Sequence, residues 1–115
     1  MVSGLEILVG IRDAVNAEGD SVPHYLFALT SGDERLAYCV VDMQTSWWDA
    51  QQRGLPVLAQ ALRPLNGHGD YTIVDGRDMN SQGVRHSCAP IGEYRLGDAR
   101  TQLLKYLTEE TSHGE

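Results

Sequence analysis

The sequence predicts an α+β fold in a single domain, 1–115, with a mostly antiparallel sheet of about five strands and three helices. The chain has 115 residues, enough for one hydrophobic core and too few for two. Its composition, 42% hydrophobic and 22% charged, is that of an ordinary globular domain. The expected elements follow the order αββαβββα, which lacks the regular strand–helix alternation of a parallel α/β sheet.

The first segment, 4–17, is predicted to be a helix. Ser3 and Glu6 have the spacing of a capping box at its start. Apolar residues then recur at intervals of three and four, at Leu5, Leu8, Ile11 and Val15. A strand is the alternative, because every second residue from Leu5 to Ile11 is apolar as well.

A β-hairpin is predicted over residues 24–41. The segments 24–30 (HYLFALT) and 35–41 (RLAYCVV) are rich in aromatic and β-branched residues, and residues 31–34 (SGDE) between them favour a turn. Both faces of each strand are apolar, whereas an antiparallel pair with one face in water alternates. Something must therefore cover the second face of this hairpin.

A helix is predicted over 46–63, with Thr45 or Ser46 as its cap. Pro64 and the stretch NGHG at 66–69 are expected to end it, because proline and glycine are the common residues after a helix.

The last third of the chain is predicted to hold three short strands and a helix. The strands are expected at 71–75 (YTIVD), 84–88 and 93–96, in one sheet with the hairpin. Asp98 is in position to cap a helix over 98–110. Residues 110–115 are polar, and a frayed tail is expected there.

The charge balance argues against several partners. The formal net charge is −7, from 16 acidic and 9 basic residues, so the protein is acidic and its field repels phosphate backbones. Direct nucleic-acid binding is therefore not expected. A basic protein partner is compatible with this surface, although solubility alone explains it as well.

The sequence predicts a cytoplasmic protein. The first 15 residues lack a basic n-region, and Glu6 and Arg12 interrupt their apolar run, so neither a signal peptide nor a membrane span is expected. Cys39 and Cys88 are too few for a disulfide framework, and both are expected to be reduced thiols.

The stretch from 73 to 94 holds the candidate chemistry. Asp75 ends a predicted strand and Asp78 follows it, at a place where acid pairs of hydrolases are often held, although aspartate is also a common turn residue. His86 and Cys88 would share one face of a strand, about 7 Å apart, so the histidine could activate the thiol. A half-buried thiol beside a surface histidine is the simpler interpretation. Two ligands do not complete a zinc site, and neither a metal nor a cofactor is expected.

Trp47 and Trp48 suggest a binding surface. Adjacent residues of a helix point about 100° apart, so both indoles cannot face one core.

The chain has none of the common nucleotide-binding or hydrolase motifs.

Two functions remain. We expect a non-enzymatic ligand- or protein-binding module that acts as a homodimer through Trp47 or Trp48, with ligand contacts from Arg85 and His86. Its partner is a second copy, a small molecule or a basic protein. The alternative is a small hydrolase or thiol-dependent transferase that uses Asp75, Asp78, His86 and Cys88.

Overall fold

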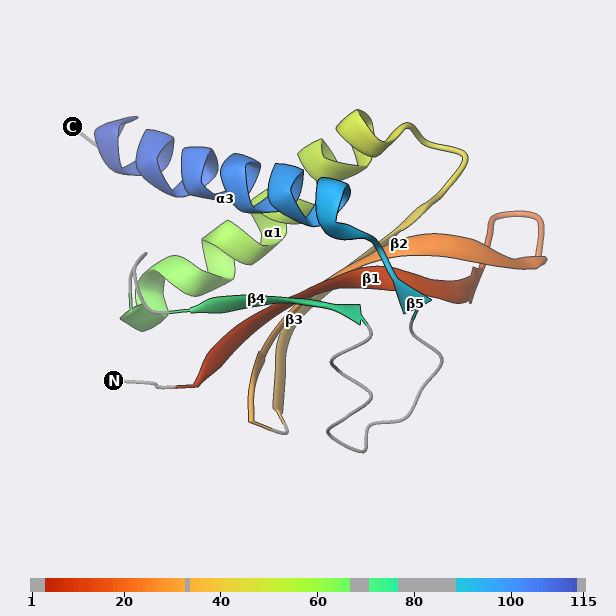
Figure 1. Ribbon diagram of the computed structural model, residues 1–115, viewed down its shortest axis with the longest axis horizontal. Helices are drawn as coiled ribbons and strands as arrows, with labels where there is room; N and C mark the ends of the chain where they lie inside the picture. The colour runs from red at the N-terminus through yellow and green to blue at the C-terminus, as the bar shows by residue number, and fades with distance from the viewer. Residues whose placement is uncertain (1–3, 33, 67–70, 77–88, 114–115) are drawn as a thin grey trace.

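In the computed structural model, two helices pack on one face of a five-stranded mixed sheet (Figure 1). The structure describes residues 4–32, 34–66, 71–76 and 89–113. The strands are β1 (Leu5–Val15), β2 (Ser21–Ser31), β3 (Glu34–Asp42), β4 (Thr72–Asp75) and β5 (Ala89–Pro90). The helices are α1 (Trp47–Asn66) and α3 (Glu93–His113). The expected α+β class is confirmed, whereas the expected third helix is not found among the described residues.

The sheet has the order β3-β2-β1-β4, so β3 and β4 lie at its edges. β2 pairs antiparallel with both β1 and β3. β4 runs parallel to β1, with Glu6 opposite Thr72, and β5 then pairs antiparallel with Gly10 and Ile11 of β1. The sheet is therefore mixed, and the prediction of a mostly antiparallel sheet is only partly met.

The predicted helix over 4–17 is wrong, because this segment forms the central strand β1. Leu5, Ile7 and Val9 point to the helices and belong to the main core, as the alternative reading of the pattern implied. Leu8 lies on the opposite face and is buried there as well. A strand between two others has both faces available for burial, so its apolar residues also match a helical period.

The hairpin is confirmed and is longer than predicted. β2 begins at Ser21 because it pairs along its whole length with β1, from Val15 opposite Ser21 to Leu5 opposite Ser31. Gly32, with φ of 60°, occupies the turn between β2 and β3. This left-handed conformation favours glycine.

The predicted helix 46–63 is confirmed as α1, and Ser46 is its cap. The Ser46 Oγ accepts a hydrogen bond from the Asp49 amide at 3.1 Å, and the Ser46 carbonyl accepts one from the Ala50 amide at 2.8 Å. The helix passes Pro64 and ends at Asn66, three residues later than predicted. The predicted strand 71–75 is confirmed as β4.

The strand predicted at 93–96 is wrong, because α3 already begins at Glu93. Gly92 has φ of 97°, and its carbonyl accepts a hydrogen bond from the Leu96 amide at 2.9 Å, so the first turn is helical. Asp98 lies inside the helix and is not its cap. The helical backbone continues to His113, into the segment 110–115 where a frayed tail is expected. The strand predicted at 84–88 lies outside the described residues.

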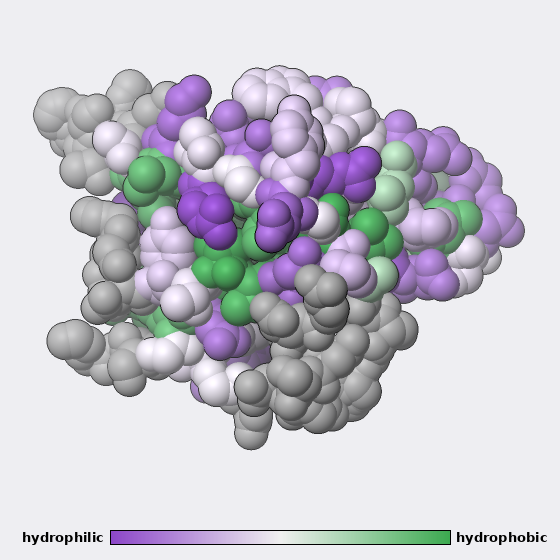
Figure 2. Space-filling model, in the orientation of Figure 1, coloured by the Kyte–Doolittle hydropathy of each residue, from purple (hydrophilic) through white to green (hydrophobic). Residues whose placement is uncertain are grey.

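The main core lies between the sheet and the helices. Figure 1 shows α1 and α3 on the same side of the sheet, and α1 contacts β2 and β3 while α3 contacts β4. Figure 2 shows hydrophobic side chains in the band between the helices and β4, where this core reaches the surface. Both described helices lie on this face, so they do not cover the second face of the hairpin.

Gly54 brings α1 into direct contact with the sheet. A Cβ atom at this position would overlap the ring of Phe27, only 2.5 Å from its Cγ. Phe27 is fully buried at the centre of β2. The helix can approach the sheet this closely only because residue 54 has no side chain.

We expect Gly54→Ala to lower the free energy of unfolding by about 1–3 kcal/mol, because the added methyl group must displace a buried ring. Gly97→Ala is the matched control, since Gly97 lies in α3 with nothing within 4 Å of its Cβ position. That change should raise the free energy of unfolding by roughly 0.5–1 kcal/mol through helix propensity. Urea denaturation measures both values, and equal effects of the two substitutions would contradict the close contact.

Candidate functional site

Asp75, the first predicted site residue, is a buried anchor for the start of α3. It is the last residue of β4 and is 8% exposed. Its Oδ1 accepts a hydrogen bond from the Ile91 amide at 2.8 Å, and its Oδ2 accepts one from the Gly92 amide at 3.2 Å. Both carboxylate oxygens therefore hold the backbone just before the helix begins.

The other predicted catalytic residues, Asp78, His86 and Cys88, lie outside the described residues, as does Arg85. The structure therefore does not test whether they lie near Asp75, and the small hydrolase or thiol-dependent transferase stays a prediction. Within the described part of the chain, no three histidine, cysteine, aspartate or glutamate side chains are grouped as in a metal site.

Trp47 is half-buried and connects the two helices to the sheet. Its ring lies 5.0 Å from that of Tyr25 and is stacked on that of Phe27 at 6.1 Å. Its Nε1 donates a hydrogen bond to the Asp98 Oδ2 in α3 at 3.1 Å. The Arg95 guanidinium lies 6.0 Å from the same ring. These contacts account for Trp47 as a structural residue.

Trp48, by contrast, is 55% exposed. It lies in the first turn of α1, six residues after the end of β3. The divergence of adjacent helical residues correctly predicted that one indole would lie outside the core. An exposed indole is costly in water and is a common anchor of protein interfaces.

β3 forms a free edge of the sheet. Among the described residues it pairs only with β2, so one side of its backbone has no strand partner. Ala37 pairs with Leu29 but Arg35 pairs with Thr30, so Leu36 is an extra residue, a β-bulge. The sequence pattern identified the strand, but it gave no sign that the strand would be an edge.

The second face of the sheet carries a smaller apolar cluster. Leu8, Leu26 and Ala28 are buried there, although both described helices lie on the other face. The Arg12 Nη1 donates a hydrogen bond to the Tyr38 hydroxyl at 2.9 Å. Because this bond joins β1 to β3, it crosses β2 above Leu26. The two side chains therefore cover part of the second apolar face of the hairpin, as its sequence led us to expect.

Arg35 also contacts Tyr38 on this face. Its guanidinium carbon lies 4.3 Å from the centre of the phenol ring. Arg12 and Arg35 thus converge on one aromatic side chain, which is 37% exposed. The structure shows no carboxylate of a described residue paired with either arginine.

Cys39 is a half-buried thiol on the helix-facing side of β3. Burial raises its pKa above the ordinary value, and the nearby Arg53 guanidinium lowers it by a smaller amount. The thiolate, which is the nucleophilic form, is therefore less populated than in an exposed cysteine. Burial likewise raises the pKa of Tyr71 against the smaller effect of Arg100.

No helix in the described part of the chain is long and apolar enough to cross a membrane. No family model matches the sequence, and comparison with curated proteins and with solved structures gives no match either. The function must therefore be inferred from the residues and their geometry.

We expect Asp75→Ala to lower the free energy of unfolding by about 2–4 kcal/mol, because two backbone amides lose a charged acceptor. The amide protons of Ile91 and Gly92 should exchange faster in this variant, which hydrogen-exchange NMR detects. Asp13→Ala, at an exposed position of β1, is the control and should change stability little. If both variants unfold at the same urea concentration, Asp75 is not an anchor.

The raised pKa of Cys39 predicts slow alkylation. In a Cys88→Ser variant, iodoacetamide should react with Cys39 more slowly than with a small thiol at pH 7, because less thiolate is present. The rate should still rise above about pH 8.5, the ordinary thiol pKa. A rate that matches the small thiol across this range would contradict the effect of burial.

The complementary Cys39→Ser variant tests the enzyme alternative through Cys88. A thiol activated by His86 should react with iodoacetamide near neutral pH much faster than a small thiol, and His86→Ala should remove the excess. Slow alkylation that rises only near pH 8.5 would leave the thiol-dependent mechanism without a nucleophile.

Proposed function

We propose that the protein is a non-enzymatic protein-binding module that acts as a homodimer. In this proposal, a second copy of the chain binds along the free edge of β3. The observation that supports this proposal is the edge itself. β3 has nine residues, and residues 36–41 (LAYCVV) in its interior are uncharged. A strand that is paired on one side only, as β3 is among the described residues, presents a row of backbone donors and acceptors to a further strand.

The edge has few of the features that prevent edge strands from pairing with a strand of another chain. Its interior contains neither lysine nor proline, and its charged residues stand at the ends, at Glu34, Arg35 and Asp42. The bulge at Leu36 interrupts only the beginning of the strand. From Ala37 to Val41 the strand is regular and open to a partner.

Trp48 is the second element of the proposed interface. Its largely exposed indole lies in the first turn of α1, the helix that packs against β3. Tryptophan contributes strongly to the energy of interfaces, and closed two-fold dimers are the commonest assemblies of one chain.

Substitution of Trp48 tests the proposal. Wild-type protein at micromolar concentration should sediment as a species of twice 12.7 kDa. Trp48→Lys should weaken the dimer by roughly tenfold or more, because it replaces an interface aromatic with a charge. Analytical ultracentrifugation measures both the mass and the dissociation constant.

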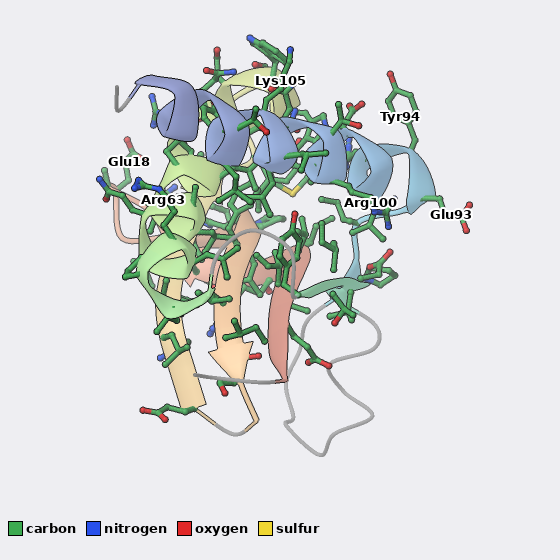
Figure 3. All side chains as sticks on the ribbon, turned by 90° about the vertical axis from the view of Figure 1, so that its left-hand side faces the viewer. Glu18, Arg63, Glu93, Tyr94, Arg100 and Lys105 are labelled. Carbon is green, nitrogen blue, oxygen red and sulfur yellow. The ribbon has the colours of Figure 1, made fainter. Side chains whose placement is uncertain are left out.

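Tyr94→Lys is the matched control, since Tyr94 is 81% exposed and points away from the body of the protein at the start of α3 (Figure 3). This variant should dimerise as the wild type does. A wild-type chain that stays at 12.7 kDa on concentration would overturn the proposal.

A further inference from the structure

The free edge of β3 is complementary to itself. Arg35 stands near its beginning and Asp42 at its end. Arg35 pairs with Thr30 and Asp42 with His24, so both charged side chains lie on the face of the sheet away from the helices. On a regular strand, residues seven apart point to opposite faces. Arg35 and Asp42 lie on the same face because the bulge adds Leu36 between them.

We infer that two copies of the chain pair their β3 strands antiparallel about a two-fold axis at Cys39. This inference rests on the proposed function and specifies its partner and register. Arg35 of each copy then lies opposite Asp42 of the other, which gives two equivalent charge pairs in each dimer. Opposite charges across a strand pair are stabilising, whereas like charges are destabilising.

The same register matches the apolar residues between these charges. On the face away from the helices, Tyr38 lies opposite Val40 of the other copy, a favourable pairing of an aromatic with a β-branched side chain. On the helix-facing side, Ala37 lies opposite Val41, and the small side chains of the two Cys39 residues meet at the axis.

Neighbouring registers lose the charge pairs. An axis at Tyr38 places Arg35 opposite the apolar Val40. An axis at Val40 places Tyr38 opposite Asp42 and leaves Arg35 beyond the paired segment. Only the axis at Cys39 places Arg35 of one copy opposite Asp42 of the other. It does so because Leu36, the extra residue of the bulge, does not count in the pairing.

Both charged groups are available for such a pair. Arg35 stacks on Tyr38 but has no carboxylate partner within the described residues. The Oδ1 of Asp42 accepts a hydrogen bond from the Gln44 amide at 2.9 Å, and the structure shows no bond from a described residue to Oδ2. Because the axis stands perpendicular to the sheet, the helices of both copies lie on one side of a continuous sheet.

Charge reversal tests the register. Arg35→Asp alone and Asp42→Arg alone should each weaken the dimer by at least about tenfold, because each creates two like-charge pairs. An equimolar mixture of the two variants should form a heterodimer, in which both pairs are again opposite in charge. Ultracentrifugation of the separate variants and of the mixture measures this, and circular dichroism checks that each variant is folded.

Lys105→Asp is the control. Lys105 is exposed in α3, which packs on β4 at the opposite edge of the sheet, so its reversal should leave dimerisation unchanged. A dimer that withstands both reversals, or a mixture that stays monomeric, would overturn the register and leave the homodimer in place. A wild-type monomer would overturn both.

Discussion

The absence of a side chain at Gly54 sets the distance between the helical layer and the sheet. The ring of Phe27 occupies the space that a Cβ would need, so α1 lies directly on β2. This approach brings Trp47 onto Tyr25 and Phe27, and its indole nitrogen then reaches Asp98 in the second helix. The position of α3 therefore depends on how closely α1 approaches the sheet.

The elements that could be predicted from the sequence have their signals within a few residues. The turn near Gly32 lies between two apolar strands, and Ser46 caps α1, which begins at the next residue. The first strand was mistaken for a helix because burial on both faces removes the alternation that distinguishes a strand. Its parallel partner β4 lies far along the chain, with Glu6 opposite Thr72, and local patterns carry no information about such a pairing.

In the candidate sites too, local features could be predicted from the sequence, whereas features that depend on distant residues could not. Asp75 was recognised as a polar residue at the end of a strand, but its role depends on the amides of Ile91 and Gly92, which only the folded chain brings to it. The divergence of Trp47 and Trp48 followed from helix geometry alone. The edge position of β3 and the bulge at Leu36 depend on the order and register of strands, so no sequence pattern indicated them.

The bonds of Asp75 also join two points of the chain that are far apart in sequence. Its carboxylate holds the end of β4 beside the start of α3, sixteen residues further along at Ile91. The last helix is thus tied to the rest of the domain at two points, at its first turn through Asp75 and at Asp98 through the indole of Trp47. Separating this helix from the sheet would break both contacts together, which favours a cooperative loss of helix and sheet on unfolding.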